Sequence, residues 1–291
     1  MIKFNFKIVS IFALLFSLNS FSAKSVELEF YFPVAVGGAA ASTVEELTNT
    51  YMELNPGVTI KPIYAGSYTD ATTKAITAAK GGNPPPMAVL IAIDIFKFYD
   101  EDLVMPWDDI LSAEEKENWI GGFYSAFMKN SQIDGVTYGI PFQRSTPVLY
   151  YNKDAFREVG LDPERPPQNW AEQLEYAQKL TKKGSDGNIE RYGIRIPTKG
   201  FPSWLTSGLI YQNGGQMTNG LGTETFLDTP EVIEAVQYLV DLSEKHKVMR
   251  PGTLEWGATP KAFFEGQTAM MWTTTGNLTN VRKNAPFDFG V

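Results

Sequence analysis

A polar tetrad in front of a predicted strand is the part of this sequence best suited to bind an anion. Residues 141–156 read PFQRSTPVLYYNKDAF, in which the apolar VLYY is typical of a buried strand. Gln143, Arg144, Ser145 and Thr146 come directly before it, between two prolines. An arginine presents a planar fork of donors that matches a phosphate or a carboxylate. We therefore expect Arg144 to contact an anionic ligand; the alternative is a surface salt bridge across this junction.

A second segment with anion-binding chemistry follows another predicted strand. Thr274, Thr275 and Gly276 follow that strand, residues 267–273, and lead into a predicted helix over residues 275–284. Free backbone N–H groups and the helix dipole favour an anion at such a helix start. An ordinary N-cap is the alternative, and it would account for one of the threonines.

Aromatic side chains near predicted strand ends are candidates for covering a ligand. Tyr68, in GSYTD, lies in a predicted loop after a strand, where open α/β sheets bind ligands. Trp204, in GFPSWLTSG, follows a strand expected to end at Ile196, and its ring could lie on a sugar face or a glycerol backbone. The alternatives are that Tyr68 packs over its loop and Trp204 in a helix core. Trp256 and Trp272 are weaker candidates, and Trp272 is expected in the core.

The residue inventory disfavours catalysis. The chain has no cysteine, so it cannot form a disulfide, a thiolate nucleophile or a cysteine zinc site, and its one histidine, His246, is expected on the surface. Pairs of carboxylates such as Glu45-Glu46 and Asp108-Asp109 are typical of solvated helix faces. We expect no catalytic residue, no metal and no cofactor.

The elements that must position these residues alternate between strands and helices. Residues 27–32, 58–64 and 87–93 are predicted strands separated by helices, and the last is a continuous apolar run typical of a strand buried on both faces. This order predicts an α/β fold with a parallel sheet.

A second α/β unit is predicted to begin near residue 142. We place an N-terminal lobe at residues 24–140 and a second lobe at residues 141–291. A short strand is predicted at residues 138–141. The stretch YGIPFQRST lies between the units, which makes it a hinge candidate, and ligands are often bound between domains.

The first residues resemble a secretory signal peptide. Lys3 and Lys7 flank the start of an apolar run over residues 8–18, which is followed by small residues that suit cleavage near residue 23. Removing residues 1–23 changes the formal net charge from −8 to −10. An acidic exported chain without cysteine suits the periplasm and disfavours a nucleic-acid partner.

The block STPVLYYNKDAFREVGLDPERPPQNW resembles the hinge-crossing signature of family 1 solute-binding proteins of ABC importers. GSYTD, GGNPPP and FFEGQTAMMWTTTGNLTNVRKNAPFDFGV add to the resemblance, which is strongest to the glycerol-3-phosphate-binding branch. It implies a periplasmic binding protein-like fold, in which two lobes joined by a hinge close on a solute. It also implies a monomer that delivers the solute to the transmembrane subunits of a permease.

The resemblance assigns roles to single residues and shows departures. It implies that Tyr68 and Ser145 contact the ligand, whereas Arg144 stands where a serine is usual. A glutamate of the branch that binds glycerol hydroxyls corresponds to Ala92, and Asp94 could replace it or could cap the following helix. Members of the family also continue beyond the length of this chain, so we expect either a fragment or a first sheet with exposed edges.

We therefore expect a periplasmic solute-binding protein for glycerol 3-phosphate or a glycerophosphodiester. A sugar- or oligosaccharide-binding protein of the same family, or a sensory binding protein, is the alternative. An exported hydrolase is disfavoured because the sequence shows no nucleophile with a base and no metal-binding motif.

Overall fold

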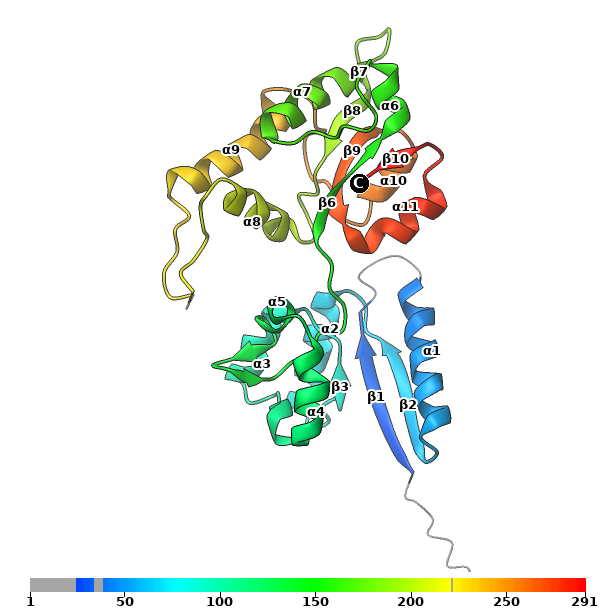
Figure 1. Ribbon diagram of the computed structural model, residues 1–291, viewed down its shortest axis with the longest axis vertical. Coiled ribbons are helices and arrows are strands. Elements are labelled where there is room, and N and C mark those ends of the chain that lie inside the picture. Colours follow the sequence, from blue (N-terminus) through cyan, green and yellow to red (C-terminus); the bar gives the residue numbers. More distant parts are fainter. Residues whose placement is uncertain (1–24, 34–38, 221) are drawn as a thin grey trace, which may run out of the picture.

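The computed structural model describes residues 25–33, 39–220 and 222–291, which form two lobes stacked along the long axis of the molecule (Figure 1). We call residues 25–33 and 39–143 lobe one, residues 144–146 the linking segment, and residues 147–220 and 222–291 lobe two. The predicted signal peptide lies outside the described residues. The predicted lobe boundary after residue 140 falls within an irregular stretch, residues 138–146, and it stays a prediction.

Lobe one is built on a parallel sheet in the order β2-β1-β3. Its strands are β1 (Val26–Phe32), β2 (Val58–Tyr64) and β3 (Met87–Ala88). The connecting helices are α1 (Ala39–Leu54), which packs on β2, and α2 (Tyr68–Lys80). This alternation confirms the parallel α/β pattern predicted for the beginning of the chain.

The rest of lobe one consists of short elements. They are η1 (Ala92–Asp94), α3 (Ile95–Asp100), η2 (Trp107–Asp109), α4 (Ala113–Asn118), η3 (Ile120–Gly122), α5 (Ser125–Met128), β4 (Gln132–Ile133) and β5 (Val136–Thr137). The strands β4 and β5 form an antiparallel hairpin.

Two strand predictions in lobe one are wrong. The apolar run at residues 87–93 forms only the two-residue strand β3, and Ile93 is 71% exposed. After β3 the backbone leaves the sheet and forms η1, in which the N–H of Asp94 donates to the carbonyl of Ile91. Residues 138–141 form no strand, because the N–H groups of Tyr138 and Gly139 both donate to the carbonyl of Ser131.

Lobe two is built on a mixed sheet in the order β10-β6-β9-β8-β7. Its strands are β6 (Pro147–Asn152), β7 (Lys182–Lys183), β8 (Ile189–Arg195), β9 (Thr268–Thr274) and β10 (Phe289–Gly290). The central strand β9 runs antiparallel to β6 and parallel to β8.

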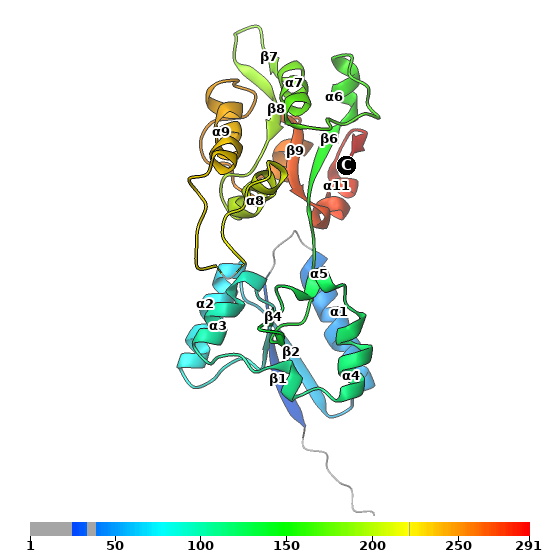
Figure 2. The same ribbon diagram turned by 60° about the vertical axis from the view of Figure 1, so that its left-hand side comes forward.

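Helices cover both faces of this sheet (Figure 2). They are α6 (Lys153–Glu158), α7 (Trp170–Leu180), α8 (Pro202–Gln212), α9 (Pro230–Glu244), α10 (Thr259–Phe264), η4 (Thr275–Asn277) and α11 (Leu278–Asn284). Because side chains alternate along a strand, Met270 joins a hydrophobic cluster with α7 and α9, whereas Met271 joins one with α10 and α11. Both methionines are fully buried, so β9 is the middle of the lobe-two core.

Within the part of the chain that the structure describes, no helix has the length and apolar character needed to cross a membrane.

The core around Phe156 should dominate the stability of lobe two. Its ring is fully buried and lies 4.7 Å from the ring of Tyr151 and 5.6 Å from that of Tyr176, between centroids. We expect Phe156→Ala to lower the free energy of unfolding by about 3–5 kcal/mol, because it removes buried area and leaves a cavity. Ile233→Ala, at a side chain that is 54% exposed, is the control, with an expected change within about 0.5 kcal/mol. Equal urea midpoints for the two variants would contradict this assignment of the core.

Candidate ligand-binding site at the junction of the lobes

The linking segment is hydrogen-bonded to lobe one through the side chain of Arg144. Its Nη2 donates to the carbonyl of Phe127 at 3.2 Å, to Oδ1 of Asn130 at 3.1 Å and to Oγ of Ser131 at 3.2 Å. These acceptors lie at the end of α5 and just beyond it. The guanidinium of Arg144 is therefore held against lobe one.

The other end of the linking segment is hydrogen-bonded to lobe two. The N–H of Thr146 donates to Oγ1 of Thr275 at 3.2 Å, and the N–H of Thr275 donates back to the carbonyl of Thr146 at 3.0 Å. Ser145 lies between the two anchors and is half-buried. A ligand contact of Ser145 would thus be made by a residue that belongs to neither sheet.

Arg144 carries a charge that the described residues do not neutralise. All its recorded acceptors are neutral, and among the described residues no carboxylate forms an ion pair with it, so the predicted alternative of a surface salt bridge is wrong. Its Nε is buried without a partner in the described structure. Burial lowers the pKa of the Arg144 guanidinium and the nearby Tyr68 opposes this, but an arginine remains protonated at neutral pH.

Tyr68 is the first residue of α2 rather than part of a loop, which corrects the sequence prediction. Ser67 is the N-cap: its Oγ accepts from the N–H of Asp70 at 3.2 Å, and its own N–H donates to the Asp70 carboxylate at 2.8 Å. Gly66 precedes this capping box with a φ of +99°, a conformation that favours glycine. The motif GSYTD thus fixes where the helix begins and where Tyr68 points.

Tyr68 reaches across the junction. Its ring meets that of Phe201 in lobe two edge-on, with centroids 5.9 Å apart. Burial raises the pKa of the Tyr68 phenol, and the positive charge of Arg144 partly offsets the rise. The phenol is therefore neutral at physiological pH and lies in the field of Arg144.

The aromatic contacts continue into lobe two as a series, which we call the aromatic row: Tyr68, Phe201, Trp256 and Trp204. Phe201 and Trp256 meet edge-on at 6.1 Å, and Trp256 stacks on Trp204 at 6.3 Å with 16° between the rings. Trp204 is 39% exposed, so the alternative that it packs in a helix core is wrong. Sequence reasoning missed Phe201 and ranked Trp256 low. Phe201 could have been noticed because it is an aromatic residue directly before Pro202, where α8 begins.

Asp94 does not join the aromatic row. Its Oδ2 accepts from Oγ1 of Thr72 at 2.6 Å, which ties η1 to α2 one helical turn beyond Tyr68. Asp94 precedes α3 but makes no capping hydrogen bond to it, so the predicted helix-cap alternative is wrong. The carboxylate supports α2, the helix that carries Tyr68.

The threonine turn after β9 is only partly available to a ligand. Thr274 is 3% exposed and its carbonyl accepts from the hydroxyl of Tyr150 at 2.9 Å, whereas Thr275 and Gly276 are exposed. The predicted helix is split into the 3₁₀ turn η4 and the short α11, and Thr274 makes no capping hydrogen bond. The hydroxyl of Thr275 accepts a hydrogen bond from the linking segment instead. The predicted alternative of an ordinary N-cap is therefore wrong.

The structure thus brings Tyr68, Arg144, Ser145 and Trp204 to the junction of the lobes, with Thr275 and Gly276 beside the linking segment. Thr274 is buried, and the half-buried Asp94 is bonded to Thr72 instead. Among the described residues, no cluster of histidine and acidic side chains could hold a metal ion.

Two α/β lobes joined by one short segment, with aromatic rings where they meet, define a two-lobed binding protein. A model of the family described as bacterial extracellular solute-binding protein matches residues 37–291. The chain belongs to this family.

Relatives and solved structures agree with this assignment. The chain is 28% identical over 262 residues to the sn-glycerol-3-phosphate-binding periplasmic protein UgpB of Shigella dysenteriae serotype 1, and this covers 87% of the chain and 58% of the relative. It is similar in fold to UgpB from Mycobacterium tuberculosis in complex with glycerophosphocholine (TM-score 0.79, 24% identity, 91% of this chain and 64% of that chain). It is also similar to the substrate-binding protein Lmo0181 from Listeria monocytogenes in complex with cycloalternan (TM-score 0.77, 22% identity, 92% and 66%). The chain therefore spans less than two thirds of the curated relative's length.

The capping box before Tyr68 gives a testable pH dependence. Hydrogen bonds from the backbone and hydroxyl of Ser67 lower the pKa of Asp70. When folding lowers the pKa of a carboxyl group, its ionised form stabilises the folded state at pH values above the unfolded-state pKa. This stabilisation is lost as the pH falls through the folded-state pKa. We expect Ser67→Ala to cost about 1 kcal/mol at neutral pH and to raise the pKa of Asp70 towards its ordinary value, measured by urea unfolding and an NMR titration. Thr73→Ala, at an exposed position of the same helix, is the control. An unchanged Asp70 titration in Ser67→Ala would refute the assignment.

Proposed function

We propose that this protein is the solute-binding component of an ABC importer and that it captures a small phosphorylated solute, glycerol 3-phosphate or a glycerophosphodiester. The observation that carries the proposal is the unneutralised Arg144 beside Tyr68, at the start of the aromatic row. The UgpB relatives, which are named sn-glycerol-3-phosphate-binding periplasmic proteins, support the same solute class.

In this proposal Arg144 changes partners when a phosphate arrives. Its present acceptors are two side-chain oxygens and backbone carbonyls, all neutral. A hydrogen bond between charged groups is roughly twice as strong as a neutral one, so a phosphate can compete for the guanidinium. Ser145 and the phenol of Tyr68 would add neutral donors on the two sides of Arg144.

The aromatic row would cover the apolar part of the solute. Aromatic rings supply a large contact area with few rotatable bonds, and their faces suit the C–H groups of a glycerol or sugar. Trp204 and Trp256 are in lobe two while Tyr68 is in lobe one, so a solute placed along the row touches both lobes. Binding would thereby favour the arrangement in which the lobes are close.

A neutral sugar is the second candidate solute, because Trp204 and Trp256 lie nearly parallel at the exposed end of the row. Structures similar in fold include a maltose/maltodextrin-binding domain bound to maltotriose, although at 20% identity this supports only the fold. The two candidates differ in whether Arg144 matters.

We further propose that the protein works in the periplasm as a monomer, delivers its solute to the permease subunits and catalyses no reaction. The names of the UgpB relatives support the compartment, and membership of the solute-binding family supports the partner. A sensory role, in which the loaded protein docks on a receptor, is the alternative to delivery.

A thermal-shift screen tests the solute class. We expect glycerol 3-phosphate or glycerophosphocholine to raise the melting temperature, because a ligand that binds only the folded state stabilises it. Arg144→Ala should weaken the affinity roughly 10- to 100-fold, the loss of one charged hydrogen bond. Arg282→Ala, at an exposed arginine for which the described residues provide no ion pair, is the matched control. A screen in which only neutral oligosaccharides stabilise the protein would exclude the phosphate proposal.

The aromatic row can be tested independently by fluorescence. We expect the bound solute to change the emission of Trp204 and Trp256, and Trp204→Phe to reduce that change while Trp107→Phe, far from the row in lobe one, leaves it intact. An identical response in the wild type and in Trp204→Phe would place the solute elsewhere.

A further inference from the structure

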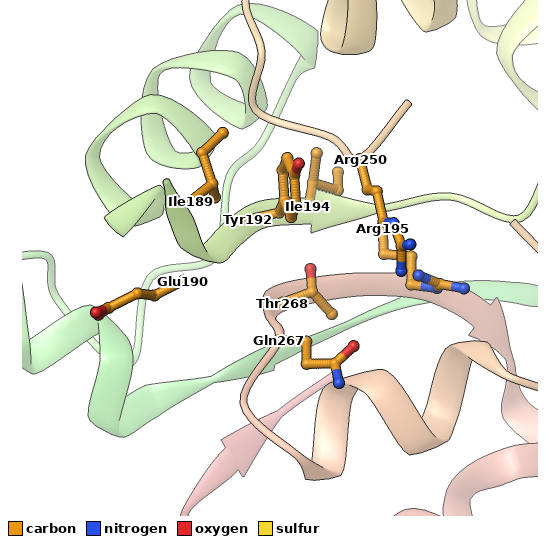
Figure 3. A pocket seen from close by; sticks show the side chains of 8 residues that line it. All are labelled: Ile189, Glu190, Tyr192, Ile194, Arg195, Arg250, Gln267 and Thr268. Carbon is orange, nitrogen blue, oxygen red and sulfur yellow. The ribbon is translucent and has the colours of Figure 1, made fainter. Parts of the chain in front are cut away.

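Lobe two contains a second concentration of positive charge, separate from the junction. Arg195 at the end of β8 and Arg250 in the segment after α9 line one pocket of about 400 Å³, together with Ile189, Glu190, Tyr192, Ile194, Gln267 and Thr268 (Figure 3). No residue of the aromatic row or the linking segment lines it. The pocket is therefore distinct from the proposed solute site.

The two guanidinium groups lie on the same side of the pocket (Figure 3), and their mutual effect is unfavourable. Burial, and to a lesser extent the charge of Arg250, lowers the pKa of Arg195. In the described structure Arg195 has one recorded hydrogen bond, from its Nε to Oγ1 of Thr259 at 3.1 Å, and Arg250 has none. Two positive charges thus line the same pocket, and within the described structure the terminal N–H groups of both guanidiniums have no hydrogen-bond acceptor.

The nearby acidic groups do not neutralise this pair. The carboxylate of Glu190 lies at the opposite end of the pocket and points away from the arginines (Figure 3). Glu244 lines a neighbouring pocket that Arg250 also borders, but its ion pair is with Lys247 at 3.8 Å. Glu255 pairs with Lys199 at 2.9 Å. No ion pair within the described part of the chain includes Arg195 or Arg250.

The other polar lining groups are already engaged or neutral. Oγ1 of Thr268 donates to the carbonyl of Met270, and Nε2 of Gln267 donates to Glu265. The phenol of Tyr192 and the second N–H of the Gln267 amide are the remaining neutral side-chain donors on the lining. The available donors are therefore almost entirely cationic, which selects for an acceptor that carries negative charge.

We propose that Arg195 and Arg250 form an anion-binding site for a phosphate-type oxoanion, on lobe two and independent of the solute site. Two guanidinium forks match a tetrahedral anion with several oxygen acceptors, because each fork can donate to a different pair of oxygens. The pocket volume of about 400 Å³ is large enough to admit inorganic phosphate. A bound anion would remove the repulsion between the two arginines.

Isothermal titration of the purified chain with inorganic phosphate, at low and constant ionic strength with chloride as the balancing anion, tests the site. We expect Arg250→Gln to weaken phosphate binding at least about tenfold, since it removes one charged donor pair. Arg250 is exposed, so this variant should fold, and Arg250→Lys should restore part of the affinity. Arg282→Gln, an exposed arginine in lobe two, is the matched control that should bind as the wild type.

Arg144→Ala separates this site from the junction. If the inference holds, this variant keeps the phosphate binding that Arg250→Gln loses, and Arg250→Gln keeps the thermal stabilisation by glycerol 3-phosphate. The inference fails if the wild type does not bind phosphate, if Arg250→Gln binds as the wild type, or if Arg144→Ala alone abolishes phosphate binding. The last result would leave the junction as the one site.

Discussion

The arrangement of the two lobes depends on a short extended segment whose ends are bonded to different lobes. Arg144 fastens the segment to the end of α5, and the paired hydrogen bonds between Thr146 and Thr275 fasten it to the turn after β9. A rotation of the lobes must therefore be taken up between these anchors, near Ser145. The anchors to lobe one are side-chain hydrogen bonds, which can adjust at modest cost, whereas the pair Thr146–Thr275 continues the β6–β9 pairing beyond Pro147 and Thr274. The residues that link the lobes thus include Arg144 and Ser145, which are proposed to contact the solute.

The partners of Arg144 are compatible with the ligand role proposed for this half-buried charge. A salt bridge would have to be broken before the guanidinium could bind an anion, and breaking a buried ion pair is expensive. Neutral acceptors hold the group in place without neutralising it. Since its Nε has no partner in the described structure, the group is incompletely satisfied as it stands. This combination distinguishes Arg144 from the cations of the exposed ion pairs in lobe two, whose charges are neutralised by a carboxylate.

The sequence predicted elements well where one local signal determined them. The strand predicted at residues 58–64 has the same bounds in the structure, because Asn-Pro-Gly ends the preceding helix and an apolar pattern follows. The prediction of a loop at Tyr68 is an exception. The spacing of Ser67 and Asp70 is that of a capping box, a local signal that would have predicted the helix start at Tyr68. The run at residues 87–93 is different: its strand ends where pairing with β1 ends, and an apolar run carries no information about its partner. The candidate site divided in the same way. Arg144 and Tyr68 were predicted as site residues from their local context and stay predictions, whereas the aromatic row depends on a tertiary contact between residues 201 and 256, which no local pattern reveals.

The pairing of β6 with β9 also constrains the order in which the chain can fold. Lobe one forms its sheet from strands that are close along the chain, because β1 pairs with β2 across α1 and with β3 across α1, β2 and α2. In lobe two, Pro147 at the start of β6 pairs with Thr274 at the end of β9, so the centre of the sheet is missing until nearly the whole lobe has been made. Contacts between residues distant in sequence form slowly, since the intervening chain must first be ordered. During synthesis from the amino terminus, β6 with its apolar VLYY segment therefore has no β9 to pair with until α6 to α10 have been made. For a chain of this design, that interval is when a chaperone that shields apolar strands would matter most.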